Sequence, residues 1–290
     1  MNTLTKELVA DAVYQAIPRI ACVLPCDVRE GLIAAQEAES HPRGAVVLDQ
    51  LLQNADIAET DMVPICQDTG TVWVCLEVGP DMMIPGDIFE CVNDAVSRAY
   101  TEAKLRKSVV RDALFDRTNT ADNTPAFCDI HFSDKPGARL HVLLKGGGSD
   151  NASRVVMLVP GAGKQGVVDE IITCVREKAA NACPPLIIGV GVGSTFDKVG
   201  HLAKSALLRE VGSPAKDERT QAFENELLEK VNALGIGPGA LGGSTVALAV
   251  HVETAPCHIA ALPLAINMGC SAMRRTTIEL VGEGMKGEAQ

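Results

Sequence analysis

The sequence predicts a mixed α/β (α+β) protein with helices around mixed β-sheets, folded as a single domain over residues 1–290. Two patterns predict this class. Segments with apolar residues at helical spacing alternate with short β-branched runs, and no obvious linker separates them. Hydrophobic residues make up 47% of the chain, enough for a sizeable core, whereas aromatic residues make up only 3%. That core must therefore be built from Val, Ile, Leu and Ala.

The first half of the chain predicts long helices followed by strands. The expected elements are helices over 4–23 and 26–57, the strand TVWVCLEV at 71–78, a helix over 86–114, and strands CDIHFS and RLHVLLK at 128–133 and 139–145. The strand at 71–78 follows the turn-forming residues Asp68, Thr69 and Gly70.

The second half continues the alternation. The expected elements are a strand at 154–160, a helix over 167–182, the strand PLIIGVGVG at 185–193, helices at 196–209 and 216–234, and two paired strands at 244–253 and 258–266. The helix ending near 182 stops at Cys183-Pro184-Pro185, because proline cannot continue a helix.

Charge and composition exclude several classes of protein. The 26 basic and 37 acidic residues give a net charge of −11, so a basic footprint for nucleic acid is not expected. No stretch approaches the ~18–20 uninterrupted apolar residues of a membrane span. The N-terminus carries no apolar core of a signal peptide. We therefore expect a cytoplasmic protein with neither a nucleic-acid nor a membrane partner.

The ten cysteines are not expected to form disulfides in a reducing compartment, and no CxxC pair is present. Four of them occupy apolar positions of predicted helices or strands and are expected in the core: Cys22, Cys75, Cys91 and Cys174. Three lie at element boundaries: Cys66, Cys183 and Cys270. Three converging thiolates could hold three irons of a cubane and leave the fourth open. On spacing alone, Cys128 and Cys257 remain alternative ligands.

The glycine-rich stretches do not match nucleotide-binding motifs. GAGKQG at 161–166 has Gln165 where a P-loop requires Ser or Thr, and GVGVGSTF at 189–196 lacks the third glycine of G-x-G-x-x-G. Glycines also permit close backbone approach to a small anion, and KGGGSDNAS at 145–153 has this character.

Three polar residues are candidates for a pocket. Asp68 stands two residues after Cys66 and could act as an acid or base, or simply cap a turn. Arg106 lies in a basic cluster, KLRKSVVR, which is either a solvated helix face or a carboxylate-binding site. His258 lies twelve residues before Cys270 and is either functional or a satisfied strand histidine.

Five blocks carry a family resemblance in matching order over nearly the whole chain: PICQDTG (64–70), KGGGSDN (145–151), NACPPLIIGVGVGSTFDKVGHLAKSALLRE (181–210), GIGPGALGG (235–243) and HVETAPCHIAALPLAINMGC (251–270). With them the sequence resembles the iron–sulfur hydro-lyase family, which contains class I fumarases and L-tartrate dehydratases. The length is similar to that of the separate alpha subunit of two-subunit members. The resemblance implies an alpha-type N-terminal catalytic domain.

The resemblance also implies a site. A [4Fe–4S] cluster with one iron not bound by protein would be held by Cys66, Cys183 and Cys270. The substrate pocket for a small dicarboxylate would be lined by Gln67, Asp68, Arg106, Gly147, Gly148 and His258, with Asp68, His258 and Arg106 as the catalytic set. The remaining contacts would come from a beta subunit that carries a swivelling domain, in a heterotetramer.

The implied reaction is reversible hydration of fumarate to L-malate. KGGGSDN and GSTFDK resemble fumarase members, whereas Ser271, Met273 and Arg274 depart from the histidine that often follows the third cysteine. L-tartrate dehydratase and a mesaconate-type hydratase are therefore alternatives within the family. Outside it stand a non-catalytic iron–sulfur carrier or sensor and a cluster-free protein that binds an organic acid.

Overall fold

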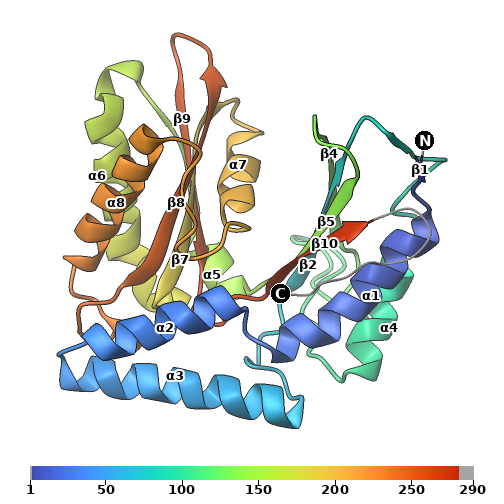
Figure 1. Cartoon of the computed structure of the whole chain (residues 1–290), viewed down its shortest axis with the longest axis horizontal. Helices are drawn as coiled ribbons and strands as arrows, with labels where there is room; N and C mark the ends of the chain where they lie inside the picture. The colour runs from blue at the N-terminus through green and yellow to red at the C-terminus, as the bar shows by residue number, and fades with distance from the viewer. Residues whose placement is uncertain (1, 281–290) are drawn as a thin grey trace. The chain divides into compact units, whose positions relative to one another are not determined.

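The computed structural model describes residues 2–280, which divide into two units with separate cores. Within the described residues, unit 1 comprises 2–25, 57–147 and 274–280, and unit 2 comprises 26–56 and 148–273. The predicted mixed α/β class is confirmed (Figure 1). The segments of the two units alternate along the sequence, so no linker in the chain marks a border between them.

Unit 1 is a four-stranded mixed sheet with helices on one face. Its main elements are α1 (Lys6–Cys22), β2 (Thr71–Val78), α4 (Val92–Glu102), β4 (Phe127–Phe132), β5 (Ala138–Lys145) and β10 (Arg275–Leu280), and the short β1 (Asn2–Thr3) pairs with β3 (Met82–Met83). The strand order is β10-β5-β2-β4, with β2 antiparallel to β5 and parallel to β4. Alternate residues Val72, Val74 and Leu76 of β2 join α1 and α4 in one buried cluster.

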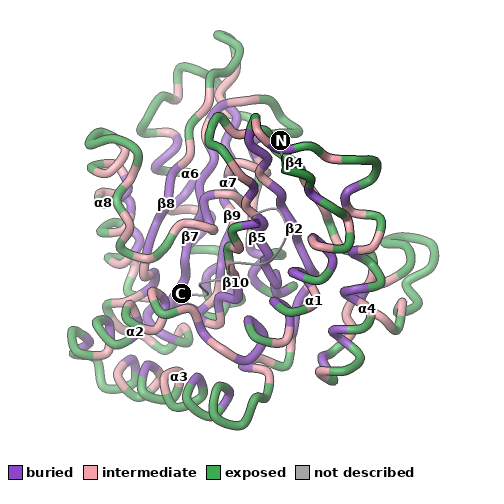
Figure 2. Tube along the Cα trace, turned by 45° about the vertical axis from the view of Figure 1, so that its right-hand side comes forward, coloured by how far each residue is buried: buried purple, intermediate pink, exposed green. Residues whose placement is uncertain are grey.

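Unit 2 contains a second four-stranded mixed sheet, with strand order β6-β9-β7-β8. Its elements are α2 (Cys26–Ala38), α3 (Pro42–Asp61, whose last residues belong to unit 1), α5 (Gly147–Asn151, whose first residue belongs to unit 1), β6 (Arg154–Leu158), α6 (Gly163–Lys178), β7 (Leu186–Ser194), α7 (Val199–Ala206), α8 (Glu218–Asn232), β8 (Ala247–Cys257) and β9 (Leu262–Gly269). Short 3-10 turns lie at η1 (Pro160–Ala162), η2 (Ala179–Ala182) and η3 (Pro238–Ala240). Helices α6 and α8 cover one face and α7 the other (Figure 1), and the strands between them are buried along most of their length (Figure 2).

The glycines of β7 allow α7 to lie directly on the sheet. A Cβ at Gly189 would come within 2.1 Å of the Ala203 carbonyl oxygen, and one at Gly191 within 2.5 Å of the Val199 carbonyl oxygen. Any side chain here would collide with the helix backbone. Gly189 and Gly191 of GVGVGSTF thus serve helix–strand packing.

Two expected helices are shorter than predicted. The helix expected over 26–57 is two helices, α2 and α3, because the chain breaks at 39–41 before Pro42, whose ring cannot continue a helix. The helix expected over 86–114 is only α4, because Lys104 adopts a left-handed conformation with φ 54° and the N–H of Leu105 returns to the carbonyl of Tyr100 at 2.9 Å. Arg106 therefore lies in an irregular segment, so a helix face is wrong for it.

The expected pairing of the last two strands of unit 2 is also wrong. Strands β8 and β9 do not pair with each other, because β7 lies between them, parallel to β8 and antiparallel to β9. The connection at 258–261 therefore passes across the end of β7.

One helical stretch has the length and apolarity of a membrane span. It runs over Lys6–Ala38, with a mean hydropathy of 1.3 in its most apolar window, and 56% of that window is buried inside the structure. Val9, Val13, Ile17 and Ile20 of α1 belong to the core of unit 1. The core helix of a soluble protein has the same character, so this stretch is weak evidence for a membrane span.

Candidate active site

The loop between α3 and β2 holds Asp68 by both carboxylate oxygens. Oδ1 accepts the N–H of Gly70 at 3.0 Å, and Oδ2 accepts the N–H of Gly147 at 2.7 Å. The side chain thus connects its own turn with the first residue of α5. Gly147, which the resemblance places in the substrate pocket, thus donates its N–H to Asp68.

The backbone carbonyls of Asp68, Thr69 and Gly70 accept hydrogen bonds from buried side chains. The guanidinium of Arg274, whose residue is only 1% exposed, donates to the carbonyl of Asp68. The hydroxyl of Tyr100 lies 2.9 Å from the Thr69 carbonyl oxygen and 3.0 Å from that of Gly70, and donates to this pair. Burial raises the pKa of Tyr100 above its ordinary range, so the hydroxyl keeps the proton it donates.

A second buried amide completes this support. Asn123, fully buried, donates from Nδ2 to the carbonyl of Gly70 at 3.1 Å and accepts the N–H of Ser108 at 2.7 Å. Sequence reasoning did not assign Tyr100 or Asn123 to the site. Neither lies in a motif, although Tyr100 is one of only two tyrosines in the chain.

Cys66, Gln67 and Arg106 belong to the same part of unit 1. The thiol of Cys66 donates to Oε1 of Gln67 at 3.3 Å, and the side chain of Gln67 is exposed. The hydroxyl of Thr69 donates to the carbonyl of Arg106 at 2.7 Å, which ties the Arg106 segment to the residue after Asp68. Arg106 itself is exposed. Unit 1 therefore brings together Cys66, Gln67, Asp68, Arg106 and Gly147.

In unit 2, Cys183 and Cys270 lie at the same end of the sheet. Ile187 of β7 pairs with Gly269 of β9, so Cys270 follows β9 where β7 begins. The N–H of Ser271 donates to the carbonyl of Cys183 at 3.1 Å. Cys183 is exposed and adopts a left-handed conformation, with φ 55° and ψ 69°.

Gly148 lies beside this cysteine segment. A Cβ at Gly148 would come within 3.3 Å of the carbonyl oxygen of Asn181, two residues before Cys183. Glycine is thus the residue that allows α5 to approach this backbone closely.

The resemblance places His258 in one pocket with the cluster ligands. The structure instead separates His258 from the two cysteines of unit 2. His258 follows β8 at the end of the sheet where β7 finishes, because Ser194 pairs with Cys257. Nine residues of β7 separate the two ends, about 30 Å at ~3.3 Å per residue. The exposed His258 ring accepts the N–H of Ala260 at 3.1 Å. Cys257, the alternative ligand, lies at this same distant end.

The core cysteines differ in their chemistry from the boundary cysteines. Desolvation, with a contribution from Asp129, raises the pKa of Cys75 to about 12, and desolvation raises that of Cys174 to about 11. Both are buried, as is Cys22, whereas Cys91 is half-buried. A thiol must lose its proton to bind metal. The buried thiols are therefore poor ligands, and the expectation of a core role is confirmed for Cys22, Cys75 and Cys174.

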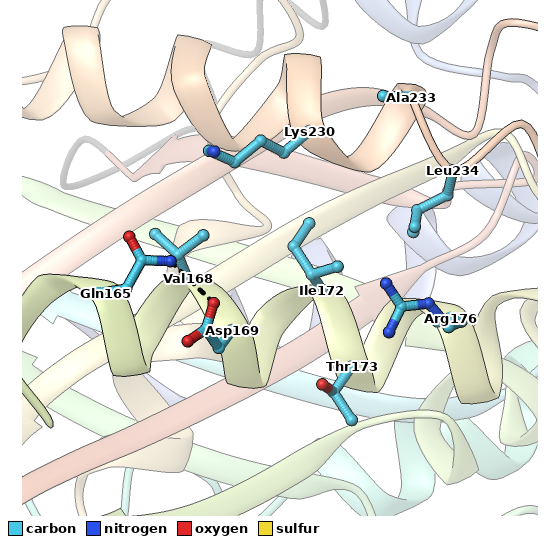
Figure 3. A pocket seen from close by; sticks show the side chains of 9 residues that line it. All are labelled: Gln165, Val168, Asp169, Ile172, Thr173, Arg176, Lys230, Ala233 and Leu234. Carbon is cyan, nitrogen blue, oxygen red and sulfur yellow. Dashed lines mark hydrogen bonds between the residues drawn. The ribbon is translucent and has the colours of Figure 1, made fainter.

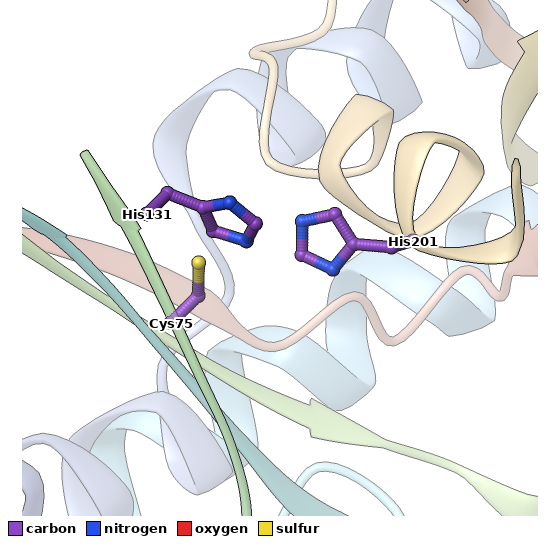
Figure 4. Close-up of side chains that lie close together, drawn as sticks. All are labelled: Cys75, His131 and His201. Atoms are coloured by element: carbon purple, nitrogen blue, oxygen red, sulfur yellow. The ribbon is translucent and has the colours of Figure 1, made fainter. Parts of the chain in front are cut away.

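Cys75 and His131 form a close pair on β2 and β4 of unit 1, with potential ligand atoms within 4.8 Å of one another (Figure 4). The figure also draws His201 of unit 2, whose ring lies 3.1 Å from the hydroxyl of Ser205 in the same unit. A structural metal site typically has four ligands. The pair within unit 1 offers two, and burial raises the pKa of its thiol, so these two residues do not make a metal centre by themselves.

An open groove of about 500 Å³ lies between α6 and α8 of unit 2 (Figure 3). Its polar lining includes Arg176, Lys230 and Asp169, and the Asp169 carboxylate accepts from the amide of Gln165 at 2.8 Å. None of the predicted site residues lines this groove.

Comparison with known proteins defines the class of protein. A Methanocaldococcus jannaschii protein provisionally named L(+)-tartrate dehydratase subunit alpha is 36% identical over 92% of this chain and 95% of its own. The L(+)-tartrate dehydratase subunit alpha of Escherichia coli K12 is 32% identical over 89% of this chain and 86% of its own. The chain therefore falls in the class of these hydro-lyase alpha subunits.

The family follows from a second comparison. The family model described as fumarate hydratase (Fumerase) matches residues 10–279. The chain belongs to this family, so the resemblance stated from the motifs is confirmed.

Proposed function

We propose that this chain is the alpha subunit of a cytoplasmic [4Fe–4S] hydro-lyase that hydrates fumarate to L-malate reversibly, in a heterotetramer with its beta subunit. The observation that carries the proposal is the anchored Asp68 in the segment of Cys66, together with the pairing of the Cys183 and Cys270 segments through the Ser271 N–H. L(+)-tartrate is the second candidate substrate, because it appears in the names of the similar proteins.

The donor set fits an iron–sulfur cluster. Cys183 is exposed, Cys66 and Cys270 are partly exposed, and all three lie in loops beside strand or helix ends. Thiolates in loops are the usual ligands of such clusters. We propose Cys66, Cys183 and Cys270 as the ligands; when bound, the cluster would supply an iron without a protein ligand that polarises the carbon–oxygen bond of the substrate.

The residues of the chain then have separate roles. In dehydration Asp68 delivers a proton to the departing hydroxyl oxygen while a base of the beta subunit takes the proton from the neighbouring carbon. In hydration Asp68 takes a proton from water and that base returns one to the carbon. The exposed Arg106 guanidinium and Gln67 amide hold substrate carboxylates, since a guanidinium matches a carboxylate in two hydrogen bonds. The N–H of Gly148, an exposed residue, adds a donor. His258 has no role at its own chain's cysteines, because it lies at the other end of the sheet.

The test is anaerobic co-expression with the beta subunit, followed by absorbance of the fumarate double bond after addition of L-malate, L-tartrate or D-tartrate. The variant Cys66→Ser should abolish activity, and Cys26→Ser, which changes an exposed cysteine that is not a proposed ligand, should not. Activity on tartrate alone would identify tartrate, and not fumarate, as the substrate. An intact cluster without any hydro-lyase activity would favour a carrier or sensor.

A further inference from the structure

Glu39, between α2 and α3, is a buried carboxylate with four hydrogen bonds. Oε1 accepts the N–H of His41 at 2.9 Å. Oε2 accepts the N–H and hydroxyl of Ser244 at 2.8 and 3.0 Å and the N–H of Thr245 at 3.3 Å. Glu39 is only 9% exposed, and no part of the proposed reaction uses it.

Burial opposes ionisation of Glu39, but the hydrogen bonds from His41, Ser244 and Thr245 outweigh it and hold its pKa below the ordinary value. The side chain is therefore a carboxylate, and its bonds to N–H groups are of the stronger, charge-assisted kind. Glutamine could not replace it, because the amide NH₂ would face donors.

Ser244 and Thr245, which Glu39 holds, directly follow the glycine loop 237–243. A Cβ at Gly237 would come within 2.1 Å of the backbone of Gly242, and one at Gly243 within 2.7 Å of Oε2 of Glu39. Both glycines have positive φ, 70° and 134°. The loop is thus folded tightly on itself and directly against the carboxylate.

The same loop contacts the segment of Cys183. The N–H of Gly239 donates to the carbonyl of Pro184 at 2.8 Å, and the carbonyl of Cys183 accepts the N–H of Ser271 at 3.1 Å. Cys183 is a non-glycine residue in a left-handed conformation, which persists only where its surroundings fix it. The carbonyls of Cys183 and Pro184 are therefore both anchored.

We propose that Glu39 is a positioning residue, which holds loop 237–243 against Pro184 and so fixes Cys183 for ligation of the cluster. The anchoring of the loop is a property of unit 2 alone, and only the consequence for the cluster rests on the proposed function. Glu39 acts through the loop and touches neither substrate nor cluster.

The test compares Glu39→Gln with Glu37→Gln, an exposed glutamate near the end of α2, in the full chain with its beta subunit. The first readouts need no cluster: amide hydrogen exchange at Gly239 and the rate at which iodoacetamide alkylates Cys183 in metal-free protein. We expect exchange at Gly239 to rise about tenfold in Glu39→Gln, equivalent to about 1.4 kcal/mol, and not in Glu37→Gln. The rate of Cys183 alkylation should also differ from the wild-type rate in Glu39→Gln and not in Glu37→Gln.

The second readout is the loss of visible cluster absorbance to an iron chelator, which should be about tenfold faster in Glu39→Gln. If Glu39→Gln does not fold, Ser244→Ala, which removes only the hydroxyl donor, replaces it and should give a smaller increase in both rates. Unchanged exchange at Gly239 would overturn the anchoring. Faster exchange with cluster loss at the wild-type rate would overturn the role toward Cys183.

Failure of the proposed function has a different result. If the wild-type complex binds no cluster after anaerobic reconstitution, the hydro-lyase proposal fails. The anchoring by Glu39 is then still decided by Gly239 exchange and Cys183 alkylation in the metal-free protein, where equal rates in Glu39→Gln and Glu37→Gln would refute it.

Discussion

Replacement of Asp68 by Asn tests the proposed proton transfer with the smallest change in shape. Each carboxylate oxygen accepts one backbone N–H, from Gly70 at 3.0 Å and from Gly147 at 2.7 Å. Asn has one acceptor oxygen and one donor NH₂ group. One of the two N–H groups must therefore lose its acceptor, and the negative charge of the carboxylate is lost as well.

Burial decides which hydrogen bond is lost. Gly70 is buried and Gly147 is exposed, so the amide oxygen should turn to Gly70 and water should replace the partner of Gly147. A fully buried unsatisfied N–H costs about 1–3 kcal/mol, and we expect a cost near the lower end, about 1 kcal/mol. Loss of a general acid or base typically lowers turnover by about 10²–10⁴-fold, which is much more than this structural cost.

The assay measures urea unfolding, cluster absorbance and kcat for L-malate dehydration in Asp68→Asn and in the control Asp61→Asn, which changes an exposed aspartate at the end of α3. We expect a small loss of stability, an unchanged cluster spectrum and at least a hundredfold lower kcat in Asp68→Asn alone. Unchanged kcat would refute the proton transfer. A parallel loss of cluster and kcat would refute it too, because Asp68 would then only support the Cys66 segment.

Two further predictions concern the cores of the two units. Gly189→Ala places a Cβ 2.1 Å from the Ala203 carbonyl oxygen and should lower the unfolding free energy by about 1–3 kcal/mol. The control Gly161→Ala, whose Cβ would meet no atom within 4 Å, should leave the unfolding free energy unchanged. Equal urea midpoints for the two variants would contradict this prediction. Burial lowers the pKa of His141 although Glu77 opposes it, so the unfolded chain binds the proton more readily. As the pH is lowered past about 6.5, the unfolding free energy should therefore decrease by up to ~1.4 kcal/mol per pH unit. Urea unfolding of His141→Gln should show a weaker decrease.

Strands could be predicted from the sequence with more accuracy than helix ends. The β-branched run TVWVCLEV coincides with β2, because a strand buried along most of its length is favoured by such apolar and β-branched residues. The ends of α2 and α4 depend instead on contacts that no local pattern shows. The break after α2 is stabilised by Glu39 and its bonds to residues about 205 positions away, and α4 ends where Lys104 becomes left-handed.

The position of His258 shows the limit of spacing arguments. Twelve residues from His258 to Cys270 do not fix the distance between them, because such a segment can fold back on itself or run straight. In the structure the segment contains β9 (Leu262–Gly269), a straight strand of eight residues that separates His258 from Cys270. The distance therefore depends on the conformation of the segment and not on its length in residues.

In the candidate site, the chemistry of the residues could be predicted from the sequence, whereas their positions could not. Cys66 and Asp68 could be singled out because thiolates and carboxylates are chemically distinctive wherever they stand. Their placement depends on Tyr100, Asn123 and Arg274, which bind the backbone of the 68–70 segment from 30 to 206 residues away. A side chain that orders a catalytic loop needs only a hydrogen-bond donor and burial, properties shared by many core residues, so such positioning residues emerge only from the folded chain.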